Sequence, residues 1–277
     1  DHYQNMDNLR DAFVRFINRL PFYGFALVCG DDPEIQGILG RVVRRVVTYG
    51  FGEKNDLVLS IQSSGAQGSR FSLSRKGVSL GEAAVSLPGR HNALNAAAAI
   101  GVALELGIPF ATAARGLQRF TGVRRRFQLK GEVKGVRVID DYAHHPTELR
   151  AALQAAREAL GTGSGRLVVA FQPHLYTRTQ LLYKEFAQAL EAADEVFLAG
   201  IYAARETPIA GVSSQLIADL LHAAEKKVTY LSEMDALAPK VLDSLRPGDL
   251  FMTAGAGSID KLGDAVLAAL KAAEAEA

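Results

Sequence analysis

Apolar and polar residues alternate with changing period along this chain, and the first segments have a βαβ-like order. Residues 9–20 carry apolar side chains at helical spacing, which predicts a helix. Short apolar runs at 25–29 and 44–49 predict buried strands. Between them, Asp32 before a proline is typical of a helix cap and predicts a helix over 34–40. This rhythm favours a mostly parallel sheet.

The next segment has a different pattern. Residues 56–86 alternate apolar and polar side chains around a Ser/Gly-rich turn at 65–68, which predicts an antiparallel hairpin or a small appended sheet. An Ala-rich run to about residue 106 and a further run at 108–120 predict two helices.

After residue 126 the pattern becomes a regular α/β alternation. Strands are predicted at 127–133, 136–139, 167–171, 195–199, 227–230 and 250–253. Helices are predicted at 146–160, 178–193, 213–224, 234–245 and 259–275. Such alternation is typical of a doubly wound, Rossmann-like sheet with helices on both faces. The pattern changes near Val123, so we expect an α/β domain over 1–123 and a second over 124–277.

Composition narrows the class of protein. The chain has 277 residues and is 48% apolar, enough for two ordinary cores. A net charge of +1 gives no indication of nucleic-acid or membrane binding, and no apolar run is long enough to span a bilayer. The single cysteine, Cys29, excludes an internal disulfide framework and fits a reducing compartment. The chain does not begin with Met, so we expect residues upstream of Asp1.

Polar residues cluster where the 136–139 strand ends, in the run Asp-Asp-Tyr-Ala-His-His-Pro-Thr-Glu at 140–148. In open α/β sheets, ligands bind outside the carboxyl ends of strands. Two carboxylates and two imidazoles there, including Asp141, His144 and His145, could accept ribose hydroxyls, hold a metal-bound water or move protons. The alternative is a solvated loop leading into a capped helix.

Two further strand ends carry candidate chemistry. In Phe-Gln-Pro-His-Leu-Tyr-Thr-Arg-Thr (171–179), His174 and Arg178 could hold a carboxylate and Tyr176 could line the pocket. In Thr-Ala-Gly-Ala-Gly-Ser (253–258), bare backbone could approach a phosphate. That glycine pattern lacks the third glycine of the dinucleotide fingerprint, so a simple tight turn is the alternative.

Asn92 and Asn95 lie three residues apart at a helix start, where they could bond a planar heterocycle such as adenine. Asn92 as a simple N-cap is the alternative. Farther along, three consecutive arginines at 124–126 are suited to phosphate recognition, or form a solvated hinge.

Taken together, these motifs closely resemble those of the Mur ligase family. The matching runs are Gly-Arg-His-Asn-Ala-Leu-Asn, Gly-Val-Arg-Arg-Arg-Phe and the two His-containing strand ends, with Leu-Pro-Phe-Tyr-Gly and Gly-Asp-Asp-Pro near the start. The resemblance runs through the whole chain. It implies the later part of a central ATPase domain followed by a complete C-terminal Rossmann-like domain, with a UDP-binding domain of the same protein missing. The phosphate loop of this family, of the Gly-x-x-Gly-Lys-[Ser/Thr] type, does not occur in this sequence.

The resemblance implies roles for the nucleotide-binding candidates. Asn92 and Asn95, with His91 beside them, would contact the adenine of ATP. Arg126 would approach the phosphates, and Asp141 would contact the ribose.

It also implies roles on the substrate side. His144 and His145 would line the reaction cleft, whereas His174, Tyr176 and Arg178 would hold the incoming amino acid.

The implied activity is an ATP- and Mg²⁺-dependent cytoplasmic ligase of peptidoglycan synthesis, with His2 helping to bind the metal. It would join L-alanine to UDP-N-acetylmuramate through an acyl phosphate. This chain alone is expected to be inactive, because the phosphate loop that stabilises phosphoryl transfer is absent from it. The alternatives are another amino-acid-adding ligase of the family, a non-catalytic nucleotide-binding or scaffold module, and an NAD-dependent oxidoreductase built on residues 255–257.

Overall fold

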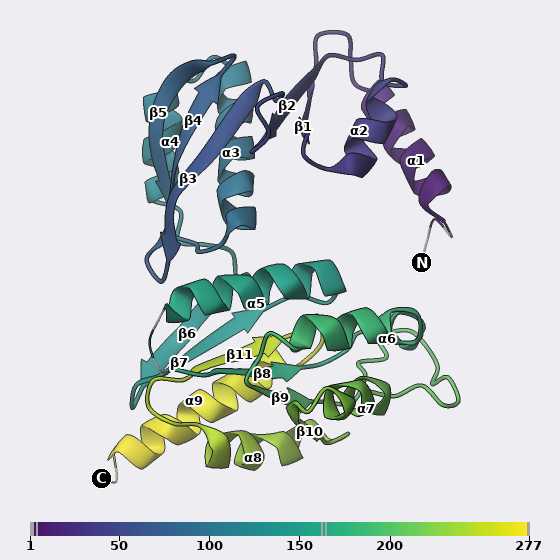
Figure 1. Cartoon of the computed structure of the whole chain (residues 1–277), viewed down its shortest axis with the longest axis vertical. Helices are drawn as coiled ribbons and strands as arrows, with labels where there is room; N and C mark the ends of the chain where they lie inside the picture. The colour runs from purple at the N-terminus through teal and green to yellow at the C-terminus, as the bar shows by residue number, and fades with distance from the viewer. Residues whose placement is uncertain (1–2, 4, 162, 164, 276–277) are drawn as a thin grey trace. The chain divides into compact units, whose positions relative to one another are not determined.

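The structure, a computed structural model, describes residues 3, 5–161, 163 and 165–275. The chain divides into two compact units, Asp1–Thr121 and Gly122–Ala277. Each unit contains one mixed sheet with helices packed on it, so the predicted α/β class is confirmed (Figure 1). No helix among the described residues is long and apolar enough to cross a membrane.

The first unit is built on a five-stranded sheet of order β1-β2-β3-β4-β5. Its elements are α1 (Met6–Asn18), β1 (Ala26–Cys29), α2 (Pro33–Leu39), β2 (Val46–Gly50), β3 (Leu57–Gly65), β4 (Gly68–Arg75), β5 (Val78–Val85), α3 (Arg90–Glu105) and α4 (Phe110–Gln118). Strands β1 to β3 are parallel, and β3 to β5 form an antiparallel meander. The antiparallel segment predicted over 56–86 is therefore confirmed.

Helix α3 packs closely on this sheet because its inner face is small. Ala93, Ala97 and Ile100 are buried against a core that includes Leu57 and Phe71. A Cβ on Gly101 would lie 2.8 Å from a methyl carbon of Leu57, so the close approach depends on that glycine.

The second unit contains a six-stranded sheet of order β10-β9-β8-β11-β7-β6. Its elements are β6 (Gln128–Val133), β7 (Val136–Asp141), α5 (Pro146–Leu160), β8 (Leu167–Phe171), α6 (Tyr176–Leu190), β9 (Glu195–Leu198), α7 (Gln215–Ala223), β10 (Lys227–Tyr230), η1 (Met234–Ala236), α8 (Leu237–Ser244), β11 (Leu250–Ala254) and α9 (Asp260–Ala275). Only the β6–β7 pair is antiparallel among the pairs that join these strands.

Both faces of this second sheet are covered, as a doubly wound fold requires. Helices α5, α6 and α7 pack on one face around Phe171 and Phe186, and α8 and α9 pack on the other around Phe197 and Phe251 (Figure 1). The central strands β8 and β11 are buried at every position, which explains their continuous apolar sequence.

The strand order also places the candidate chemistry. After β7 the chain crosses to β8 and continues outward to β10, and β11 then returns between β8 and β7. This reversal creates a switch point, where open α/β sheets bind ligands. The three strand ends singled out in the sequence, those of β7, β8 and β11, therefore lie side by side.

Candidate functional site

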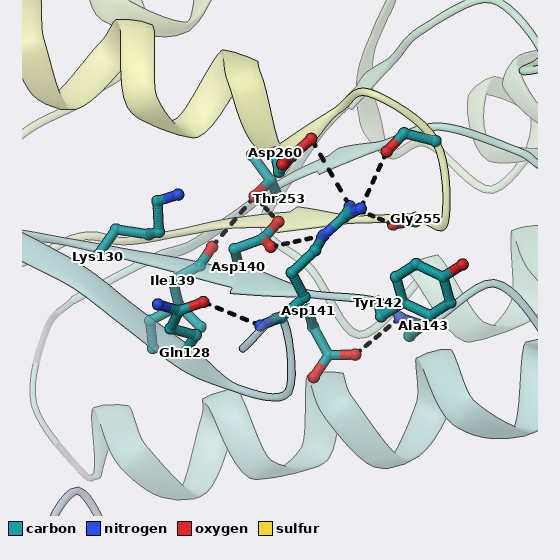
Figure 2. A network of polar contacts seen from close by, with 12 residues as sticks. Gln128, Lys130, Ile139, Asp140, Asp141, Tyr142, Ala143, Thr253, Gly255 and Asp260 are labelled. Atoms are coloured by element: carbon teal, nitrogen blue, oxygen red, sulfur yellow. Dashed lines mark hydrogen bonds and ion pairs between the residues drawn. The ribbon is translucent and has the colours of Figure 1, made fainter. Parts of the chain in front are cut away.

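Two neighbouring carboxylates end strand β7 and point to opposite faces of the sheet. Successive side chains of a strand alternate, so Asp140 follows Val138 toward the α9 side while Asp141 follows Ile139 toward the α5 side. Both carboxylates are buried. Figure 2 shows Asp140 beside Thr253, whose hydroxyl donates to it at 2.7 Å, and Asp141 directed toward Ala143.

The carboxylate of Asp141 accepts hydrogen bonds from two backbone amides, one just before β6 and one just after β7. Its two oxygens accept the amide N–H groups of Phe127 and Ala143, each at 2.8 Å. Burial raises the pKa of Asp141 to about 6, although these two amides and Arg126 act to lower it. The predicted ribose contact stays a prediction, and the structure adds a clear structural task for the same side chain.

Within the arginine run 124–126, Arg125 and Arg126 have different environments in the structure. Arg125 has a half-buried guanidinium that bonds Asp140 and the carbonyl oxygens of Gly255 and Gly257. Arg126 has a side chain that is 48% exposed, lies 5.7 Å from the ring centroid of Tyr142, and has Glu148 at 3.8 Å. Of these two arginines, Arg126 is the one that can reach a ligand.

The two adjacent histidines also differ. The Nδ1 of His144 lies 2.9 Å from the carbonyl oxygen of Tyr142, which can only accept, so Nδ1 carries the proton and a neutral His144 has its basic nitrogen at Nε2. His145 is the N-cap of α5, and its Nδ1 accepts the N–H of Thr147 at 3.3 Å. Burial lowers the pKa of His145, with Glu148 opposing.

At the end of β8, His174 comes beside the β7 loop. Its ring lies 6.0 Å from that of His144 and stacks on Tyr202 at 5.6 Å. Backbone hydrogen bonds pair this segment with Tyr202, whose N–H donates to Pro173 O and whose carbonyl accepts from Leu175. Leu175 has φ +72°, which is strained for a residue with a side chain.

Helix α6 begins directly after this strained residue and has no side-chain cap of its own. Glu206, from the loop after β9, accepts from the amide and hydroxyl of Thr177 instead. Burial acts to raise the pKa of Glu206, but these hydrogen bonds and Arg178 lower it overall. Tyr176 and Arg178 are thus held on the first turn of a helix whose amide groups favour anions.

Two polar atoms at this strand end are buried and have no hydrogen-bond partner among the described residues. They are Oε1 of Gln172 and Nδ1 of His174. Burial, and then the neighbouring Arg178 and His144, lower the pKa of His174, so its imidazole is neutral at pH 7. Buried polar groups without partners are unusual in proteins, and such groups mark places where a ligand can bond.

In the first unit, the three nucleotide candidates surround the start of α3. The helix begins at Arg90 after Gly89, so the alternative in which Asn92 is the N-cap is wrong. The buried Asn92 instead donates to Pro88 O at 2.8 Å, whereas His91 is half-buried and Asn95 is exposed. Of the two asparagines, Asn95 is the one that faces solvent.

The predicted metal contact of His2 lies outside the described residues. Within the described part of the chain, no group of three or more His, Cys, Asp or Glu side chains is arranged to hold a metal ion.

Comparison with known families identifies both units. The Mur ligase middle domain matches residues 1–103, and the domain described as "Mur ligase, glutamate ligase domain" matches residues 125–257. The chain belongs to the Mur ligase family. The resemblance inferred from its motifs is confirmed.

Individual Mur ligases match over nearly the whole chain. The UDP-N-acetylmuramate–L-alanine ligase of Solidesulfovibrio magneticus is 49% identical over 95% of this chain and 57% of that protein. The ligase of the same name from Geobacter sp. is 44% identical over 99% of this chain and 59% of that protein. The chain therefore spans just under three fifths of the length of these relatives.

Solved Mur ligase structures have the same fold. The UDP-N-acetylmuramate–alanine ligase of Thermotoga maritima has a TM-score of 0.79 and 26% identity, and the match covers 98% of this chain and 56% of that one. A MurF ligase from the same organism, solved in complex with ADP, has a TM-score of 0.74 at 18% identity over 100% of this chain and 60% of that one, and shows the fold alone.

Sequence reasoning gave no role to several residues that the structure brings to this edge of the sheet. They are Tyr142, Gln172, Tyr202 and Glu206. Arg125 and Asp140 were considered only as members of their runs. Strand alternation could have separated Asp140 from Asp141. No local signal indicates Tyr202 or Glu206, because both reach the site through long-range pairing.

Proposed function

We propose that this chain supplies the later part of the middle domain and the C-terminal domain of an ATP-dependent ligase that joins L-alanine to UDP-N-acetylmuramate. The proposal is supported by the names of its relatives and by the chemistry at the carboxyl ends of β7 and β8. ATP would phosphorylate the muramoyl carboxylate to give an acyl phosphate and ADP. The amine of L-alanine would then attack the acyl carbon, forming the amide and releasing phosphate.

The observation that carries this proposal is the approach of His144 to His174 in front of the first turn of α6. The two rings are 6.0 Å apart, and Arg178 is close enough to His174 to lower its pKa. Arg178 would hold the amino-acid carboxylate, with Tyr176 lining the same turn. A small amino acid bound there would present its amine to the two imidazoles.

The orientation of His144 suits that step. An α-amine must be neutral to attack, so a base has to take its proton. His144 is oriented with Nε2 as its basic nitrogen, and His174 is neutral at pH 7. We therefore assign His144 the role of proton acceptor and His174 that of a binding group. His145 would line the cleft while it caps α5.

The nucleotide roles follow from the other residues. Arg126 would bond the phosphates, because its guanidinium is the more exposed of the two beside the β7 tip. Asp141 would contact the ribose, and Asn92, Asn95 and His91 would lie at the adenine. In such reactions, positively charged side chains that contact the transferring phosphoryl group are a main source of catalysis.

The test is ADP release by the full-length protein that contains this chain, with UDP-N-acetylmuramate, ATP and Mg²⁺. Release should depend on L-alanine and should fall sharply with glycine, D-alanine or L-glutamate. Equal rates with a larger amino acid or with a preformed peptide would support instead another ligase of this family. ATP binding without ADP release under any of these conditions would favour a non-catalytic nucleotide-binding module.

A further inference from the structure

Arg125 makes an unusual set of contacts for a residue next to a proposed phosphate-binding arginine. Its Nε donates to Asp140 at 3.0 Å, its Nη1 to Gly257 O at 3.1 Å and its Nη2 to Gly255 O at 2.7 Å. All three guanidinium nitrogens are thus engaged, and the side chain is only 23% exposed. We call these four residues the Arg125 clasp.

The clasp is anchored in the interior of the second unit. Asp140 is 1% exposed and also accepts the hydroxyl of the fully buried Thr253, as Figure 2 shows. A buried carboxylate needs a cation or several donors to be stable, so Asp140 and Arg125 depend on each other. The glycines have no room for side chains, since a Cβ on Gly257 would lie 2.3 Å from Gln172 Oε1.

The backbone around Arg126 is fixed on both sides. Arg125 donates its N–H to Gln128 Oε1 and accepts from Tyr142 N at 2.7 Å, while the N–H of Phe127 is held by Asp141. Both Arg125 and Phe127 have positive φ, 59° and 47°. Backbone in this region persists only when its surroundings hold it, and here the surroundings are the clasp and Asp141.

Arg126 itself has few contacts. Its nearest acidic oxygen is 3.8 Å away, at Glu148, and its side chain is half exposed. A long, loosely held side chain can bind a ligand in a defined direction only if its backbone is fixed.

From these contacts we infer that Arg125 is a positioning residue for the ligase reaction. Through the clasp, which ties the Gly255–Gly257 loop to the tip of β7, it fixes the direction in which Arg126 projects. This inference rests on the proposed function for the role of Arg126, but not for the clasp itself.

The kinetic test is a double-mutant cycle in the full-length protein. Arg125→Lys keeps the positive charge but cannot bond three acceptors in a plane. We expect it to lower kcat by between about 10- and 100-fold, with a smaller change in the KM for ATP. In the Arg125→Lys/Arg126→Ala double variant, kcat should be no lower than in Arg126→Ala alone, because Arg125 acts through Arg126. Multiplicative losses, or a normal kcat for Arg125→Lys, would overturn the inference.

A matched control is available in the same arginine run. Arg124 is exposed and has no hydrogen bond or ion pair within the described part of the chain. Arg124→Lys makes the same exchange one residue away, and it should keep kcat within about twofold. A loss equal to that of Arg125→Lys would show that any arginine-to-lysine exchange in this run lowers the rate, and not the loss of the clasp.

A second readout is independent of activity. Hydrogen exchange of the 277-residue chain should quicken at residues 125–128 and 255–258 in Arg125→Lys, and remain as in wild type in β8 and β9. Unchanged exchange would overturn the clasp whatever the enzyme does. Absence of L-alanine-dependent ADP release in the wild-type full-length protein, with the exchange change present, would overturn the proposed function alone.

Discussion

The tips of β7 and β8 lie at the same edge of one sheet, yet they use their polar groups in different ways. At the β7 tip, Asp140 and Asp141 are buried and their carboxylates are hydrogen-bonded to Arg125, Thr253 and backbone amides. At the β8 tip, Gln172 and His174 each bury a polar atom that has no partner in the described part of the molecule, and Leu175 has a strained backbone.

The β7 tip therefore has the properties of a structural framework, whereas the β8 tip has those of a binding surface. Satisfied buried networks make a structure rigid and specific, whereas unsatisfied polar atoms are costly unless a ligand bonds them. We therefore expect substitutions at the β7 tip to act mainly on stability, and substitutions at the β8 tip to act mainly on substrate binding.

Asp141→Ala should destabilise the 277-residue chain by about 4 kcal/mol. It leaves the buried N–H groups of Phe127 and Ala143 without acceptors, at about 1–3 kcal/mol each. Urea unfolding followed by circular dichroism measures the change. Asp141→Asn keeps one acceptor oxygen and should lose about half as much. If both variants unfold like wild type, the β7 tip is not a framework.

The contribution of Asp141 to the free energy of unfolding should fall as the pH rises, because the pKa of its carboxyl group is raised in the fold. Since the pKa of Asp141 is raised to about 6 in the fold, the folded state binds more protons than the unfolded chain above pH 4. The stabilising effect is complete below the unfolded pKa and is lost as the pH rises through 6. The free energy of unfolding of wild type minus that of Asp141→Asn should fall by about 2 kcal/mol between about pH 4.5 and 7.5. A difference that rises with pH would contradict the buried environment.

Arg178→Ala should lower kcat/KM for L-alanine in the full-length protein by about 10- to 100-fold, which corresponds to about 1.5–3 kcal/mol for a lost charged hydrogen bond. The melting temperature should change little. Arg205→Ala is the matched control, because Arg205 is exposed in the neighbouring loop and has no hydrogen bond or ion pair in the described part of the chain. A fall in stability without a change in KM would place Arg178 with the framework.

The smallest effect is expected at Leu175. Leu175→Gly relieves the strain of φ +72°, whereas Leu175→Ala removes the same side chain and keeps the strain. The glycine variant should be more stable than the alanine variant by about 1 kcal/mol. Thermal unfolding of the pair provides the comparison, and equal stabilities would mean that the loop relaxes without cost.

The two tips also differ in how far the sequence alone reveals them. The sequence is enough to predict strands β7, β8 and β11, the α/β class and the placing of candidate residues at strand ends, because these follow from apolar runs and caps. Helix α5, predicted over 146–160, has those bounds in the structure.

The division of labour within each tip could not be predicted. Nothing in three consecutive arginines tells which one is half-buried, because this depends on where β11 returns in the sheet. Asp141 is predicted to face a nucleotide, and its bond to Phe127 depends on a positive-φ backbone that no residue pattern indicates. The ribose contact and the other nucleotide roles stay predictions.

The aromatic rings around the two histidines have a spectroscopic consequence. The chain contains no tryptophan and eight tyrosines, so its near-ultraviolet emission is that of tyrosine alone. Tyr142 lies 5.2 Å from the ring of His144, and Tyr202 stacks on His174. A protonated imidazole beside a phenol ring quenches its fluorescence, so the protonation of this site can be followed optically without any introduced label. Replacing Tyr202 by tryptophan would add a fluorophore whose signal no other residue of the chain overlaps.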